Sequence, residues 1–303
     1  MSSPRPGGLP TVTPALAYWP QAAPARPGRG AARQVALRAG WHRLRRGGHR
    51  AGSDVRQVHE HHFDGAGAAA FPAGEYVGQE SFMRAGEVRT LARQARVGPG
   101  VSVLDLCCGV AAPGRMITAE SGCHYLGVDH SASALATAQE LAGNLPCRFE
   151  QAHLPPLPEG RFEVVFLLET MLAFPDKEAL VGEVARVLEP GGRFAFTVEE
   201  GRPLTQQERA GMPGADTVWL VKLAEVTGAL RSAGLTVIWR QECSSSHHAI
   251  ATALLRCYRA DSPQIAGQIG TQATAELITA HQLWSDWLGS GRVRKFAVVA
   301  EKQ

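Results

Sequence analysis

The chain has 303 residues, 45% hydrophobic and 19% charged, so it can bury a substantial core and is not disordered as a whole. Residues 1–50 hold nine arginines and no acidic residue, which leaves 22 basic against 28 acidic residues in 51–303. The larger part is therefore mildly acidic and lacks the basic footprint of a nucleic-acid binder. Because no apolar run approaches the roughly 18 residues of a membrane helix, we expect no membrane insertion.

Residues 1–52 are predicted to be a disordered extension. They are rich in Arg, Pro and Gly, and neither helical nor strand periodicity persists in them. Their acid-free composition is similar to that of an organellar transit peptide. We favour a different hypothesis, in which the start codon is assigned too early and the protein begins near Val55 or Val58. Peptides from 1–50 in a mass spectrum of the native protein would rule that hypothesis out.

Residues 53–303 are predicted to form one domain in which strands and helices alternate. An amphipathic helix is expected over Glu80–Ala95. The strands expected after it are Val101–Leu106, His124–Val128, Cys147–Gln151, Phe162–Leu168 and Arg193–Val198. The helices expected between them are Gly114–Glu120, Ala132–Ala142 and Asp176–Leu188. Such alternation implies right-handed βαβ units and an α/β fold whose parallel sheet is covered on both faces.

The remainder of the chain is less regular. A helix is expected over Thr217–Ala233 and a strand over Leu235–Gln241. Residues 249–259 and 264–288 have mostly helical patterns, and a final strand is expected over Val293–Glu301.

The segment 101–114, VSVLDLCCGVAAPG, predicts a ligand-binding loop. A strand ends near Asp105, and small residues then lead into a helix whose N-terminus offers unpaired N–H groups. A dinucleotide site is disfavoured because the spacing is not G-x-G-x-x-G and a pyrophosphate would meet the Asp105 carboxylate. S-adenosylmethionine (SAM) carries a sulfonium and an ammonium instead, for which a carboxylate is favourable. An ordinary strand-to-helix loop is the alternative.

A second acidic residue, Asp129, ends the next predicted strand, 24 residues after Asp105. An acidic side chain at this place can accept hydrogen bonds from both hydroxyls of a ribose. It can also serve as the N-cap of the helix that follows, and the two roles are compatible.

With these motifs in place, residues 75–200 resemble a class I SAM-dependent methyltransferase of the small-molecule type. The loop matches the family's D-x-G-x-G-x-G, with Asp105 and Gly109 in place. Three later segments resemble the region after strand three, strand four, and the turn into strand five: FEQAHLPPLPEGRFE at 149–163, FEVVFLLE at 162–169 and ARVLEPGGRF at 185–194. The four motifs stand in the family's order and spacing.

The resemblance implies a Rossmann-like, doubly wound, mostly parallel seven-stranded sheet with helices on both faces and a helical substrate lid contributed by 201–290. It implies SAM as the methyl donor, no metal, and a small organic acceptor methylated at carbon, nitrogen or oxygen, such as a natural product or lipid-like compound. A SAM-binding enzyme of other chemistry and a non-catalytic SAM-binding protein are the alternatives. We expect a cytoplasmic protein, since six cysteines without a C-x-x-C pair are typical of reduced thiols. We also expect a monomer or a homodimer.

The resemblance also implies which residues contact the cofactor: Tyr76, Gln79, Asp105, Cys107, Gly109, Asp129, His130, Gln151, Ala152 and Glu169. Tyr76 and Gln79 lie in a segment that covers the cofactor in related enzymes, with packing and capping as the alternative. Gln151 stands where the family often has Asp facing the adenine amino group. Cys107 and Ala111 replace two loop glycines, so a backbone that needs positive φ would be strained there.

Two residues are candidates for the chemistry. Glu169, at the end of strand four, is expected to contact the acceptor or act as a base, or else to balance charge near the SAM ammonium. His247 and His248 follow strand six, and one of them is a candidate general base. His130 and His153 are expected on loops that line the cofactor cleft, where either is a candidate for a chemical role. His59–His62 departs from H-E-x-x-H at Phe63 and is expected to be a solvated helix start rather than a metal site. Four tryptophans are candidates for an apolar acceptor pocket or for core packing: Trp219, Trp239, Trp284 and Trp287.

Overall fold

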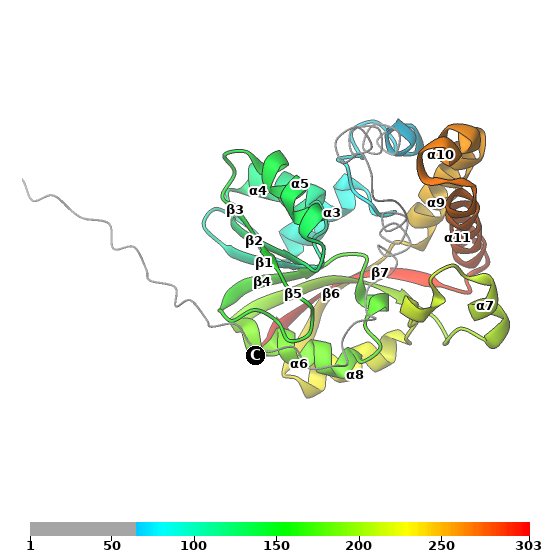
Figure 1. Ribbon diagram of the computed structural model, residues 1–303. Helices are drawn as coiled ribbons and strands as arrows, with labels where there is room; N and C mark the ends of the chain where they lie inside the picture. The colour runs from blue at the N-terminus through cyan, green and yellow to red at the C-terminus, as the bar shows by residue number, and fades with distance from the viewer. Residues whose placement is uncertain (1–64) are drawn as a thin grey trace, which may run out of the picture. The chain divides into compact units, whose positions relative to one another are not determined.

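A seven-stranded sheet forms the centre of the fold in the computed structural model (Figure 1), which describes residues 65–303. The strands are β1 Ser102–Leu106, β2 His124–Asp129, β3 Cys147–Gln151, β4 Phe162–Leu167, β5 Leu188–Glu200, β6 Leu235–Glu242 and β7 Arg294–Lys302. The sheet order is β3-β2-β1-β4-β5-β7-β6. The first five strands are parallel, and β7 runs antiparallel to both β5 and β6. The predicted Rossmann-like, mostly parallel sheet is confirmed.

Helices cover both faces of the sheet. They are α3 Ala85–Gln94, α4 Ala112–Ser121, α5 Ala132–Ala142, α6 Lys177–Val187, α7 Gln206–Gly211, α8 Leu223–Ser232, α9 Ser244–Ala260, α10 Ser262–Ile269 and α11 Thr271–Ser290. Figure 1 shows α3, α4 and α5 on one face and α6 and α8 on the other. The inner strands β1, β4 and β5 are accordingly apolar and buried almost throughout. Helices α9, α10 and α11 pack together beyond one end of the sheet (Figure 1).

Local chemistry sets the boundaries that the sequence predicts best. α5 begins after Ser131, whose hydroxyl accepts a hydrogen bond from the Ala134 N–H at 3.3 Å, and it ends at Gly143. α6 begins after Asp176, whose carboxylate accepts from the Ala179 N–H at 2.9 Å. The predicted bounds of α5 and β3 are both confirmed.

Three predicted elements were wrong in their extent. The helix expected over Glu80–Ala95 begins only at Ala85, because residues 75–84 form turns held by the Gln79 side chain. The helix expected over Thr217–Ala233 begins at Leu223, since the residues before it are extended and Val221 forms a bridge with Glu200. β5 extends back through the predicted Gly-Gly turn to Leu188, with a register shift there against β4.

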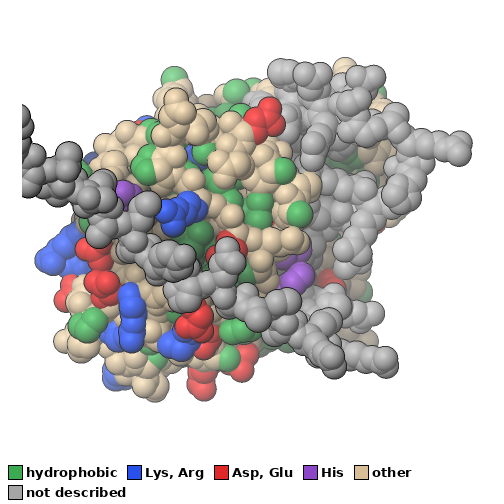
Figure 2. Space-filling view, turned by 60° about the vertical axis from the view of Figure 1, so that its left-hand side comes forward, with side chains coloured by type: hydrophobic (Ala, Val, Ile, Leu, Met, Phe, Trp, Pro, Cys, Tyr) green, Lys and Arg blue, Asp and Glu red, His purple; other side chains and the backbone are tan. Residues whose placement is uncertain are grey.

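The predicted helical stretch 264–288 is two helices. Gly270, at φ +86°, separates α10 from α11, because a left-handed backbone interrupts the helical hydrogen-bond ladder. Within residues 65–303, no helix combines the length and apolar character that crossing a membrane requires. On the face shown in Figure 2, basic and acidic side chains are intermingled over the described surface.

Several predictions fall outside the described residues. These are the disordered extension 1–52, the start-site hypothesis and the nature of His59–His62. The single-domain assignment of 53–303 stays a prediction.

Candidate functional site

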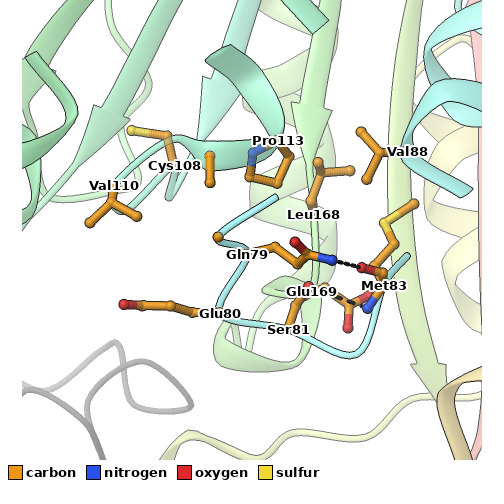
Figure 3. A pocket seen from close by; sticks show the side chains of 12 residues that line it. Gln79, Glu80, Ser81, Met83, Val88, Cys108, Val110, Pro113, Leu168 and Glu169 are labelled. Carbon is orange, nitrogen blue, oxygen red and sulfur yellow. Dashed lines mark hydrogen bonds between the residues drawn. The ribbon is translucent and has the colours of Figure 1, made fainter. Parts of the chain in front are cut away.

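A pocket opens at the carboxyl ends of β1 and β4, where ligands bind in open α/β folds. Three segments line it: residues 78–83 before α3, the loop from Cys108 to Pro113, and Leu168 with Glu169 after β4 (Figure 3). The wall is mostly apolar, and its charged side chains among the described residues are Glu80 and Glu169.

The loop between β1 and α4 has the backbone that the family's glycine motif requires. Cys107, Gly109 and Ala111 have φ of +57°, +57° and +54°. Cys107 and Ala111 are therefore strained where they replace glycine, at about 1 kcal/mol or more each. Both side chains are buried, so packing offsets part of this cost. The predicted strain is confirmed, and the loop closes despite it.

Asp129 ties this loop to the end of β2. One carboxylate oxygen accepts the Gly109 N–H at 2.9 Å, and the other accepts the Ser131 N–H at 2.9 Å and lies 3.0 Å from His130 Nδ1. The alternative role as an N-cap was wrong, because Ser131 caps α5. Asp129 is 2% exposed. A direct contact with a ribose therefore stays a prediction, and the observed role is to fix the loop.

His130, Gln151 and Ala152 gather around Asp129, away from the pocket wall. The Gln151 amide donates to the His130 carbonyl at 2.9 Å, and the Ala152 N–H donates to the Asp129 carbonyl at 3.0 Å. The His130 and His153 rings lie 6.2 Å apart. These residues form a rim at the ends of β2 and β3, where the adenine side of a nucleoside would lie if the prediction holds.

Asp105 is buried behind the loop. Its carboxylate accepts the Tyr125 hydroxyl at 2.6 Å, so it braces β1 against β2. Burial, together with the Asp105 charge, raises the pKa of Tyr125 well above its usual range. Asp105 does not line the pocket, and its predicted contact with the cofactor is untested.

Of the two residues expected to cover the cofactor, one lines the pocket. Gln79 does, but its amide is engaged in its own segment: Oε1 accepts from the Val77 N–H at 2.6 Å, and Nε2 donates to Met83 O at 2.9 Å (Figure 3). The Tyr76 ring instead packs on Phe71, with centroids 5.4 Å apart, and is not part of the lining. The structure thus favours packing for Tyr76 and capping for Gln79.

Glu169 projects into the pocket from a strained backbone, at φ +59°. Its N–H donates to the Thr197 hydroxyl at 2.7 Å, which helps to hold that conformation. One carboxylate oxygen lies 2.7 Å from Lys295 Nζ, and the other lies 3.7 Å from His247 Nδ1. Burial alone would raise the pKa of Glu169, but the charges of Lys295 and His247 lower it.

His247 lies in the first turn of α9, which follows β6, and it is 1% exposed. Nε2 is 3.4 Å from a carboxylate oxygen of Glu87 on α3, and Nδ1 faces Glu169. Although burial raises the pKa of Glu87, His247 and the Ser246 hydroxyl lower it to about 2. His247 contacts Glu169 and is not part of the pocket lining. In this geometry it does not contact an acceptor in the pocket directly.

Lys295 completes a buried network that sequence reasoning missed. It lies on β7, 2% exposed, between Glu169 and Glu199 of β5, and it contacts both carboxylates. Burial and the nearby Glu169 charge raise the pKa of Glu199. The Lys295 ammonium donates a hydrogen bond to Glu199 and also lies 2.7 Å from Glu169. The sequence held one signal for this network. Glu199 and Lys295 are charged residues that each adjoin an apolar run of a strand.

The four tryptophans do not share one pocket. Trp284 and Trp287 are buried on α11 with ring centroids 5.4 Å apart. They belong to a hydrophobic cluster that includes Leu172. Trp239 packs on the sheet from β6, and Trp219 is 39% exposed beneath Arg209. Core packing is therefore the observed role of the buried pair. The described residues contain no cluster of His, Cys, Asp or Glu arranged to hold a metal.

Comparison with known proteins agrees with this geometry. A family model described as methyltransferase domain matches residues 103–192, from β1 to the start of β5. Residues 103–192 are therefore similar to a methyltransferase domain. The sterol 24-C-methyltransferase of Pneumocystis carinii is 26% identical over 171 residues, 52% of this chain and 45% of the relative. The chloroplastic tocopherol O-methyltransferase of Arabidopsis thaliana is 32% identical over 117 residues, 37% of this chain and 34% of the relative.

Solved structures extend the likeness of fold across the methyltransferase domain and the helices after it. The cyclopropane synthase MmaA2 from Mycobacterium tuberculosis matches with a TM-score of 0.66 at 13% identity, over 82% of this chain and 98% of that one. The [4+2]-cyclase SpnF matches with a TM-score of 0.65 at 19% identity, over 82% and 92%. The chain spans less than half the length of the curated relatives that it matches.

Proposed function

We propose that the protein transfers a methyl group from SAM to a small, lipid-like organic acceptor. The observation that carries this proposal is the pocket at the carboxyl edge, bounded by the family's loop on one side and by Glu169 on the other. The residues present fit the cofactor. Between Cys108 and Pro113 the loop bears small side chains, and the start of α4 adds unpaired N–H groups.

When bound, SAM supplies a methyl group already activated by the sulfonium, so this chain need not activate a leaving group. Its task is to align the acceptor with the methyl carbon and to exclude water. Asp129 holds the loop through the Gly109 N–H, and Glu169 presents a carboxylate to the pocket. Leu168, Met83 and Val88 supply the apolar wall that excludes water.

The acceptor class rests on the pocket wall and on the names of the relatives. The lining is largely apolar, and the relatives are named for a sterol and for tocopherol. We accordingly propose a compact apolar metabolite rather than a nucleic acid, which also accords with the intermingled surface charges in Figure 2. The helical layer α9–α11 is proposed as the substrate lid. A cytoplasmic location and a monomeric or homodimeric state remain proposals.

A second candidate is a SAM-binding enzyme of other chemistry. The similarity of fold to SpnF supports this second candidate, because SpnF has the same architecture and is named as a [4+2]-cyclase rather than as a methyltransferase.

Two measurements test the proposal. In calorimetry the purified chain should bind SAM and S-adenosylhomocysteine, and binding to neither would overturn both candidates. With methyl-labelled SAM and a lipid extract, label should appear in an organic-soluble product while S-adenosylhomocysteine accumulates. Consumption of an acceptor without transfer of label would favour the second candidate.

A further inference from the structure

The pocket is anionic on its interior side. Among the described residues that line it, the charged ones are Glu80, which is exposed, and Glu169, whose side chain is 12% exposed. A buried carboxylate is costly unless cations or hydrogen-bond donors compensate it. The compensation for Glu169 comes from behind, away from the pocket lining.

A lysine and a histidine on different elements flank this carboxylate. Lys295 on β7 lies 2.7 Å from one oxygen, and His247 on α9 lies 3.7 Å from the other. Each of these two side chains also contacts a second carboxylate. Lys295 contacts Glu199 on β5, and His247 contacts Glu87 on α3. Residues of β7 and α9 thus contact the Glu169 carboxylate, and residues of β5 and α3 hold those residues in turn.

This arrangement decides between the two roles that the sequence leaves open for Glu169. A carboxylate in contact with an ammonium at 2.7 Å is a weak proton acceptor, since protonation would break the ion pair. Its negative charge is stable, and its orientation is fixed from both sides. Such a group is suited to bind positive charge rather than to remove a proton.

We propose that Glu169 is a fixed carboxylate that binds a positively charged group in the pocket, and that Lys295 and His247 are the positioning residues that hold its charge and orientation. This inference rests on the proposed function. The cation can belong to the methyl donor, as its sulfonium or ammonium, or to an amine of the acceptor. The shared chemistry is one cation against one buried anion.

The first test is calorimetry with Glu169→Gln, which keeps the shape and removes the charge. We use SAM, S-adenosylhomocysteine and 5′-methylthioadenosine, which lacks the amino-acid part, together with choline and its neutral isostere 3,3-dimethylbutan-1-ol. If the donor supplies the cation, SAM affinity falls about tenfold or more while methylthioadenosine affinity is unchanged. If an acceptor amine does, choline loses affinity and the isostere does not.

Glu178→Gln is the control, because it removes an exposed carboxylate on α6, outside the pocket lining, and should change affinities by less than threefold. Equal losses for all probes in Glu169→Gln, or no loss for any, would overturn the inference. Failure of the wild-type chain to bind SAM or S-adenosylhomocysteine would instead overturn the proposed function.

The second test separates positioning from mere structural support. The groups that face Glu169 are Lys295 and His247 directly, with Glu199, Glu87 and Cys243 behind them. In wild type, affinity for SAM should be flat from pH 7 down to pH 5, where the α-amino group of SAM is protonated. In Lys295→Met and His247→Gln, Glu169 loses a cation, so its pKa rises and SAM affinity declines as the pH falls.

Since Lys295→Met leaves two buried carboxylates together, the double variant Lys295→Met/Glu199→Gln serves as a second version with less uncompensated charge. Thermal unfolding verifies that each variant is folded. Folded variants whose affinity for SAM is lower by the same factor at every pH would overturn the positioning role.

Discussion

The Asp129 carboxylate accepts a hydrogen bond from the backbone N–H of Gly109 at 2.9 Å, across the gap between β2 and the loop after β1. The same side chain accepts the Ser131 N–H. A single buried residue therefore fixes both the loop that borders the pocket and the start of α5.

We predict that Asp129→Asn weakens SAM binding by about tenfold, because an amide has one acceptor oxygen and must turn its NH2 towards one of the two N–H groups. Calorimetry with SAM measures this loss. The control is Glu178→Gln, an exposed carboxylate on α6 outside the pocket lining, which should leave the affinity unchanged. An affinity unchanged in Asp129→Asn would show that the loop keeps its shape without this anchor.

The loop strain gives a prediction of opposite sign. Ala111→Gly should raise stability by up to about 1 kcal/mol and should preserve or raise SAM affinity, because glycine adopts φ +54° without strain. Ala112→Gly, one residue later in α4, should lower stability by about the same amount. Urea unfolding of both variants measures the difference.

Cys107→Gly should likewise preserve or raise SAM affinity, though part of its gain in stability is offset by the loss of a buried side chain. A large loss of SAM affinity in Ala111→Gly or Cys107→Gly would mean that the side chains of these residues hold the loop in shape, and that relief of backbone strain does not improve binding.

The framework of the site was predictable from the sequence because its signals are local. The alternation of strand and helix patterns in 101–151 determines β1 through β3 within a residue or so. Asp105, Gly109 and Asp129 follow strand ends, so parallel topology brings them to one edge.

The charge network behind the pocket was not predictable, because its members are far apart in the chain. Glu87, Glu169 and Lys295 meet only after β7 inserts between β5 and β6. His247 was selected as a histidine near the acceptor side, yet its position behind Glu169 depends on how α9 packs. Periodicity also failed at 217–222, where the bridge of Val221 with Glu200 overrides a helical pattern.

The pair formed by Tyr125 and Asp105 yields a stability prediction. Tyr125→Phe should cost about 1–3 kcal/mol, since a buried carboxylate loses a donor at 2.6 Å. Adding Asp105→Asn should cost less than the sum of the two single changes. Denaturant unfolding of the four chains gives the coupling, and strict additivity would mean that the hydrogen bond contributes little.

Glu87 predicts part of the acid sensitivity. Its pKa is about 2 in the folded chain against 4.5 in the unfolded chain, so its contribution to stability is complete above pH 4.5 and is lost as the pH falls towards 2. Glu87→Gln should lower stability at pH 7 by roughly 2 to 4 kcal/mol and flatten the pH dependence below 4.5. Glu120→Gln, in an exposed pair with Arg89, is the control and should have little effect. Unfolding curves at pH 7, 4 and 3 measure this, and parallel curves for both variants would contradict it.

His281 governs a different pH window. Burial lowers its pKa from 6.5 to about 4, so the unfolded chain binds a proton first and stability falls as the pH decreases from 6.5 to 4. His281→Gln should flatten the stability profile in that interval while the profile above pH 7 keeps its slope. A slope between pH 6.5 and 4 as steep as that of wild type would refute this role.

The position of β7 also has a consequence for biosynthesis. As the chain leaves the ribosome, β5 and β6 are complete while the strand that joins them is still missing, so two sheet edges stay exposed until residues 294–302 emerge. Lys295 arrives with that same strand. Closure of the sheet and neutralisation of the buried glutamates are therefore one late event, and a nascent chain that stalls before it has neither.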